Sequence, residues 1–139
     1  YTASKFALEA LSECLAQEVL PHGVKVAIIE PGIIATDMAN NIARANYDPE
    51  YPQQNRMAAM FEESLKSPAS TQIVADTITE IVVGKRGGLR HPVGPDAIPF
   101  LEWRESKSDF DWANWHNVTD EEWCKSLEKD FGMSVKLSD

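Results

Sequence analysis

Tyr1 and Lys5 are the two residues of this chain whose types and spacing could do chemistry. They stand four positions apart in the opening Tyr-Thr-Ala-Ser-Lys, so on a helix they share one face. An ammonium about 4 Å from a phenolate stabilises it by on the order of 4 kcal/mol at an effective dielectric constant of ~20, which brings a phenol's pKa from ~10 toward neutrality. Since a general acid works best with a pKa near the working pH, Tyr1 is a candidate proton donor to a carbonyl oxygen. Taken alone, this spacing fits an exposed helix pair at least as well.

The elements around this pair predict an α/β fold. Residues 1 to about 20 carry apolar side chains at helical spacing beside a second stripe of small ones, and we expect Cys14 in the core. Residues 24–29 form a β-branched apolar run, typical of a strand buried on both faces of a parallel sheet, and a Glu-Pro-Gly turn follows at 30–32. Helix, turn and strand in this order are half of a β/α repeat. The apolar stripe is Leu8, Leu11, Leu15 and Val19, and the small stripe is Ala3, Ala7, Ala10 and Cys14.

Residues 37–66 have a different, methionine-rich character. Two short helices are expected at 38–45 and 54–65, on either side of a loop. Methionine suits an adaptable apolar wall, so this region could cover a substrate pocket, although plain packing of two short helices explains it equally well. The candidate pocket residues are Met38, Met57, Met60 and Phe61.

A further helix and strand follow before a distinct C-terminal region. Ser67-Pro68 should begin the helix, with serine as the cap and proline at the first helical position, and residues 89–93 should form a last strand. Residues 95–139 contain all four tryptophans, which must pack on their own subunit, on a partner or over the pocket. Thr119 and Glu122 have the spacing of a capping box that opens another helix. Val74, Ile78, Ile81 and Val82 form the expected buried stripe of the helix after Ser67.

Composition argues against several partners. The net charge is −9 with no basic stripe, so nucleic acid or an anionic membrane surface would be repelled. No apolar run approaches the ~20 residues of a membrane-spanning helix. The two cysteines lie far apart without metal-ligand spacing, which favours reduced thiols, a cytoplasmic location and no metal site. His22, His91 and His116 likewise show no ligand spacing and are expected in turns or at the surface.

Taken together, these features resemble the short-chain dehydrogenase/reductase family. The Tyr-x-x-x-Lys helix, the buried strand and the Pro31-Gly32 pair come in the family's order, and Pro31 to Thr36 looks like its Pro-Gly-x-x-x-Thr segment. The similarity covers about residues 1–94 well and residues 95–139 more loosely. It implies the C-terminal portion of a Rossmann-like, doubly wound parallel sheet that binds NAD or NADP. Residues 37–66 would then be the substrate-covering lid, and 95–139 a divergent, acidic, tryptophan-rich extension.

The resemblance also implies residue roles. Tyr1 would exchange a proton with the substrate oxygen while a hydride moves between substrate carbon and nicotinamide. Lys5 would hold the nicotinamide ribose hydroxyls and lower the pKa of Tyr1. Backbone groups near Ile34 would meet the carboxamide, and Thr36 would contact the carboxamide or pyrophosphate. The implied cofactor-binding residues are Tyr1, Lys5, Pro31, Gly32, Ile34 and Thr36.

The implied activity is that of an NAD(P)-dependent oxidoreductase (EC 1.1.1.-) interconverting an alcohol and a carbonyl. The family's Gly-rich loop, catalytic Ser and Asn, and the residue that selects NAD or NADP all precede its tyrosine. We therefore expect this chain to be part of a longer protein and inactive alone. The apolar lid favours a hydrophobic or medium-sized carbonyl, and the family implies a homodimer or homotetramer.

Two other functions stay open. Nucleotide-sugar epimerases and dehydratases use the same Tyr-x-x-x-Lys pair, but the short segment after Pro31-Gly32 and the lack of a large C-terminal sugar domain favour simple dehydrogenases. A non-catalytic binding or scaffold protein could also share the fold, although the intact Tyr1 and Lys5 argue against it.

Overall fold

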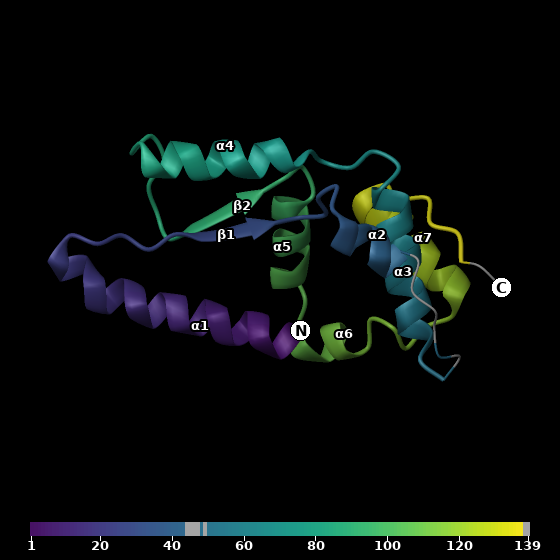
Figure 1. Cartoon of the computed structure of the whole chain (residues 1–139). Coiled ribbons are helices and arrows are strands. Elements are labelled where there is room, and N and C mark those ends of the chain that lie inside the picture. Colours follow the sequence, from purple (N-terminus) through teal and green to yellow (C-terminus); the bar gives the residue numbers. More distant parts are fainter. Residues whose placement is uncertain (44–47, 49, 138–139) are drawn as a thin grey trace.

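The computed structural model describes residues 1–43, 48 and 50–137, and it confirms the predicted α/β class. Two parallel strands pair in register, with Ile28 opposite Arg90 and Pro31 opposite Val93. A helix lies on each side of this sheet, α1 on one and α4 on the other, as in a doubly wound arrangement (Figure 1). The elements are α1 (Thr2–Val19), a 3-10 turn (Leu20–His22), β1 (Ile28–Pro31), α2 (Asp37–Ala43), α3 (Pro52–Ser64), α4 (Thr71–Val82), β2 (Arg90–Val93), α5 (Ala97–Glu105), α6 (Asp109–Ala113) and α7 (Asp120–Phe131).

The first helix forms where the sequence predicts it, but its apolar face is not covered. No residue of α1 is buried, and Leu11 is 63% exposed. Cys14 is also exposed, so the prediction that it belongs to the core is wrong. The two strands are four residues long each, which gives α1 too little surface to bury its stripes.

The strand and helix boundaries differ from prediction where long-range bonds decide them. The strand expected at 24–29 pairs only from Ile28, because the partner strand offers four residues. The helix expected from Ser67-Pro68 begins at Thr71, with the Ser70 hydroxyl accepting from the Gln72 amide. The residues before Ser70 stay extended since Ala69 bonds the Ala35 amide at 2.9 Å.

Two predicted placements of side chains are also wrong. His91 is buried rather than superficial, because alternate residues of β2 face inward, and its ring Nε2 lies 3.2 Å from the Gly88 carbonyl oxygen. Ile78 and Val82 of the expected buried stripe are exposed. The buried residue of α4 is Thr77, whose hydroxyl donates to the Ile73 carbonyl.

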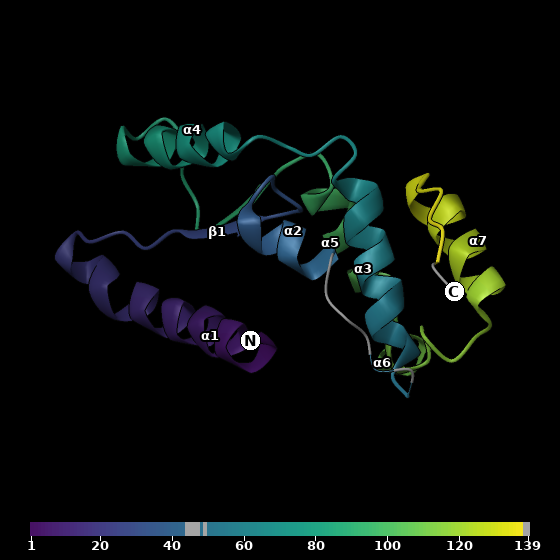
Figure 2. The ribbon, with the colours of Figure 1, turned by 45° about the vertical axis from the view of Figure 1, so that its right-hand side comes forward.

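The main core lies between α3 and α7, which run side by side (Figure 2). Trp123 and Leu127 of α7 are fully buried there against Ala59 and Met60 of α3. Helix α7 begins at the predicted capping box, with both hydrogen bonds between Thr119 and Glu122 present. The remaining tryptophans stack near this core, with the rings of Trp103 and Trp115 4.7 Å apart. The tryptophans therefore pack on their own chain.

Arg56 joins α3 to the segment of residues 116–120. It is 3% exposed, and its guanidinium donates to the Asp120 carboxylate and to the carbonyl oxygens of His116 and Val118 at 2.7–3.0 Å. It also lies over the Trp123 ring, 5.7 Å from the centroid. The start of α7 and the segment before it are thus anchored to α3. Each helix within the described ranges is too short or too polar to cross a membrane.

Candidate active site

A pocket of about 870 Å³ opens at the carboxyl ends of β1 and β2. Its lining comes from α1, the loop after β1, α2, α3, α4 and the first turns of α5. In α/β folds this edge of a parallel sheet is where ligands bind. All the candidate residues from the sequence line this one pocket: Tyr1, Lys5, Pro31, Gly32, Ile34, Thr36, Met38, Met57, Met60 and Phe61.

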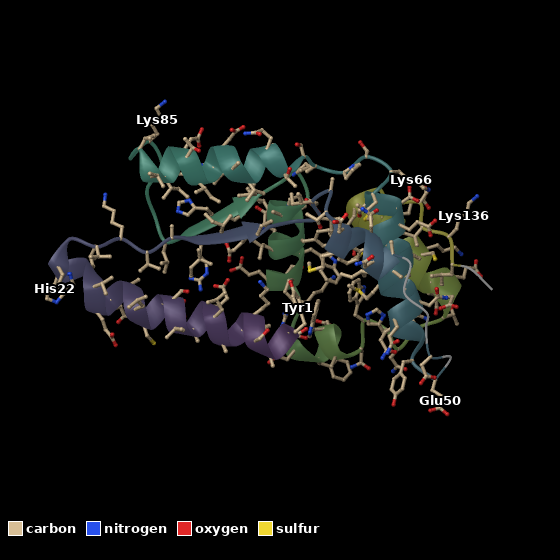
Figure 3. All side chains as sticks on the ribbon, in the orientation of Figure 1. Tyr1, His22, Glu50, Lys66, Lys85 and Lys136 are labelled. Carbon is tan, nitrogen blue, oxygen red and sulfur yellow. The ribbon has the colours of Figure 1, made fainter. Side chains whose placement is uncertain are left out.

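Tyr1 and Lys5 meet on one face of α1, as their spacing predicts. The Lys5 ammonium lies 5.5 Å from the centroid of the Tyr1 ring, and the Lys5 amide donates to the Tyr1 carbonyl at 3.1 Å. The Ser4 hydroxyl donates to the same carbonyl at 2.6 Å, so two hydrogen bonds to the Tyr1 carbonyl stabilise the first turn of the helix. Tyr1 lies toward the middle of the molecule, whereas His22, beyond the other end of the helix, lies at the periphery (Figure 3).

The loop after β1 is held by bonds at successive positions. The Gly32 amide donates to the Val93 carbonyl at 2.9 Å, and the Ile33 amide donates to the Asp96 carboxylate at 2.7 Å. Ile34 is buried and bridges to Ala69. The Thr36 hydroxyl accepts from the Ala39 amide at 3.2 Å, so Thr36 also starts α2. The loop therefore has a defined backbone at the pocket.

Helices α2 and α3 supply an apolar wall. Met60 is buried, Met57 and Phe61 are half-buried, and Met38 is exposed. The three residues of α3 also pack against the core around Trp123, so one helix serves both the pocket and the core.

The pocket also contains a carboxylate at the end of β1. Burial raises the pKa of Glu30, and the nearby Glu9 adds to the effect against the opposing charges of Arg90 and His91. One oxygen of Glu30 lies 3.4 Å from the Arg90 guanidinium, while the other is buried and has no hydrogen-bond partner in the part of the chain that the structure describes. The Glu30 carboxylate therefore belongs to β1, and its ion-pair partner Arg90 belongs to β2.

Comparison with known proteins identifies the family. A family profile described as short chain dehydrogenase matches residues 1–47. The oxidoreductase BOA17 of Botryotinia fuckeliana is 33% identical over 105 residues, which are 72% of this chain and 38% of that protein. The uncharacterized oxidoreductase YusZ of Bacillus subtilis is 31% identical over 125 residues, 85% of this chain and 44% of that protein. The chain belongs to the short-chain dehydrogenase family.

A third relative is named for its substrate. The 3-ketodihydrosphingosine reductase of Bacteroides thetaiotaomicron is 34% identical over 102 residues, 68% of this chain and 37% of that protein. The chain thus spans less than half the length of the relatives compared here. No solved structure matches it.

The pocket includes residues that the sequence did not predict. Asp96 and the first turns of α5 line it, as do side chains of α4. A usable signal was present: Gly94-Pro95-Asp96 follows β2 as Gly32-Ile33 follows β1. Because parallel strands end at the same edge, both turns belong to one site. The additional lining residues include Asp96, Ala97, Phe100, Leu101, Val74 and Ile78.

Proposed function

We propose that the full-length protein is an NAD(P)-dependent oxidoreductase that interconverts an alcohol and a carbonyl, with Tyr1 as the general acid and base. The observation that carries this proposal is the meeting of Tyr1, Lys5 and the loop after β1 in one pocket with an apolar wall. Family membership and the oxidoreductase relatives support the same reaction type.

The residues present fit the nicotinamide half of the cofactor. Lys5 offers ammonium donors to ribose hydroxyls, and the backbone around Ile34 with the Thr36 hydroxyl offers polar groups to the carboxamide. When bound, the nicotinamide supplies or accepts the hydride. During reduction the Tyr1 hydroxyl donates its proton to the substrate oxygen, and during oxidation the phenolate takes that proton back.

The apolar wall supports a hydrophobic or medium-sized carbonyl as the substrate. Met57, Met60 and Phe61 would contact its apolar body, and Met38 lies at the open side. Methionine side chains adapt to irregular shapes, so the wall suits more than one substrate. The name of the Bacteroides relative describes a ketone on a lipid-like chain, which agrees with this class.

We also propose that the full-length protein is a cytoplasmic homodimer or homotetramer. The uncovered apolar and small side chains of α1 support a covering surface for this helix, and the free thiols of Cys14 and Cys124 suit a reducing compartment. Light scattering after size-exclusion chromatography tests the assembly, and a monomeric full-length protein would contradict it.

Turnover by full-length protein tests the reaction. Oxidation of NADH and NADPH is followed with a series of apolar ketones, in the unaltered protein and in Tyr1→Phe. Loss of the proton donor should lower kcat by at least about 10²-fold. Tyr51→Phe is the matched control, because Tyr51 is exposed and lies outside the pocket lining. A Tyr1→Phe protein with full activity would refute the mechanism.

A further inference from the structure

Asp96 makes a contact that its local position does not require. It stands at the N-cap of α5, where an aspartate normally accepts from the first amides of the helix. Its side chain makes no such capping bond. Instead Oδ2 accepts from the Ile33 amide at 2.7 Å, across 63 positions of sequence. The carboxylate therefore serves the loop after β1 and not its own helix.

Two glycines make room for this carboxylate. A Cβ added at Gly32 would lie 2.1 Å from Asp96 Oδ1, and one added at Gly94 would lie 3.0 Å from it. Gly94 also has φ +109°, which side chains rarely adopt. The carboxylate is thus seated between the ends of the two parallel strands, where any larger residue at 32 would displace it.

The remaining oxygen of Asp96 makes this arrangement costly. Oδ1 is buried, and the described residues offer it no hydrogen-bond partner. A buried unpaired carboxylate oxygen lowers stability, so a residue that served the fold alone would be better replaced by a neutral one. The charge strengthens the bond to the Ile33 amide, since hydrogen bonds to ionised acceptors are the stronger ones.

We propose that Asp96 is a positioning residue of the nicotinamide site. By fixing the Ile33 amide it gives the segment from Gly32 to Ile34, which lines the pocket, one backbone conformation. It acts through this segment and has no proton-transfer role. The inference rests on the proposed NAD(P) binding, which it deepens by assigning a residue that positions the nicotinamide half specifically.

Ligands with and without the nicotinamide ring separate this role from general stability. Full-length protein is titrated with NADH and NADPH by nicotinamide fluorescence, and with ADP-ribose and 2′-phospho-ADP-ribose by calorimetry. We expect Asp96→Ala to weaken binding of the reduced dinucleotide about tenfold or more, and binding of the ring-lacking ligand by less than about twofold. Asp96→Asn keeps an acceptor and should lose less than Asp96→Ala.

Asp109 provides a control carboxylate outside the pocket. Asp109→Asn removes a carboxylate whose side chain is fully exposed on α6, and it should change neither affinity. An Asp96→Ala protein with unchanged affinity for the dinucleotide, or with equal losses for both ligands, would overturn the inference. Failure of the unaltered protein to bind NADH or NADPH would refute the proposed function itself, before any variant is measured.

Discussion

The guanidinium of Arg90 lies 2.9 Å from the carboxylate of Glu13, although the residues are 77 positions apart. Arg90 also contacts Glu9 at 3.1 Å and Glu30 at 3.4 Å, so a single side chain of β2 links α1 to the sheet. No residue of α1 is fully buried, and these ion pairs join the helix that carries Tyr1 and Lys5 to the sheet.

Replacing Arg90 should therefore loosen α1 in a salt-dependent way. We expect Arg90→Gln to lower the melting temperature of full-length protein by about 2 °C at low ionic strength, since these pairs are solvent-exposed. The difference should shrink in 1 M salt, where charges are screened within about 3 Å. A double-mutant cycle with Glu13→Gln should show coupling, whereas additive effects would contradict the link. Arg86→Gln, which breaks an exposed pair with Glu80, is the control.

Arg56 should contribute far more than Arg90 to the free energy of unfolding, because the Arg56 side chain is buried. Arg56→Met keeps the apolar volume but leaves the His116 and Val118 carbonyl oxygens unpaired, and we expect it to lower the free energy of unfolding by about 2–4 kcal/mol. Urea titration of full-length protein measures the loss. The KM for an apolar ketone should rise as well, since α3 carries the pocket wall. Arg86→Met, on the surface, should stay within about 0.5 kcal/mol. An equally small effect of Arg56→Met would contradict the anchoring role.

Local rules in the sequence predicted the parts of the fold that local bonds determine. The capping box at Thr119 forms with both of its hydrogen bonds, because its partners lie three residues apart. The start of α4 could not be predicted in this way, since the bond between Ala69 and Ala35 moves it past Ser67-Pro68. The prediction for Cys14 was wrong because helical spacing assigns a residue to one face of the helix but does not show whether another element covers that face.

The residues of the candidate site also divide into those that local motifs predict and those that only long-range contacts reveal. Motif spacing together with the family resemblance selected Tyr1, Lys5 and the Pro31 loop as candidates, and the structure brings them to one pocket. Asp96 was not predicted, because the Ile33 amide that it binds lies far away in the sequence. Only the parallel register of β1 and β2 brings Asp96 and Ile33 together.

His116 should make the contact between α3 and the segment before α7 sensitive to acid. Burial lowers the pKa of His116, and the Arg56 guanidinium lowers it further. The unfolded chain binds this proton near pH 6.5 and the folded protein only at lower pH, so stability should fall as the pH drops below about 6.5 toward the folded pKa. We expect His116→Gln to show a smaller loss of melting temperature between pH 7.5 and 5.5 than the unaltered protein. His22→Gln is the control, and an identical slope in His116→Gln would contradict the prediction.

Gly32→Ala should reproduce the loss of Asp96. The added Cβ would lie 2.1 Å from Asp96 Oδ1, so the carboxylate must rotate away and give up the Ile33 amide. We expect a cost of about 1–3 kcal/mol in unfolding free energy, together with weaker dinucleotide binding. In the Asp96→Ala background the same substitution should cost less, because the clash is gone, and the coupling should reach about 1–2 kcal/mol.

Gly87→Ala is the matched control for this cycle, since a Cβ added there would have no described residue other than its chain neighbours within 4 Å, and the φ of Gly87 is not in the left-handed region. It should change the free energy of unfolding by less than about 1 kcal/mol, and in the stabilising direction if at all. Equal costs of Gly32→Ala with and without Asp96 would show that the glycine is needed for another contact. Asp96 would then not be what keeps position 32 a glycine.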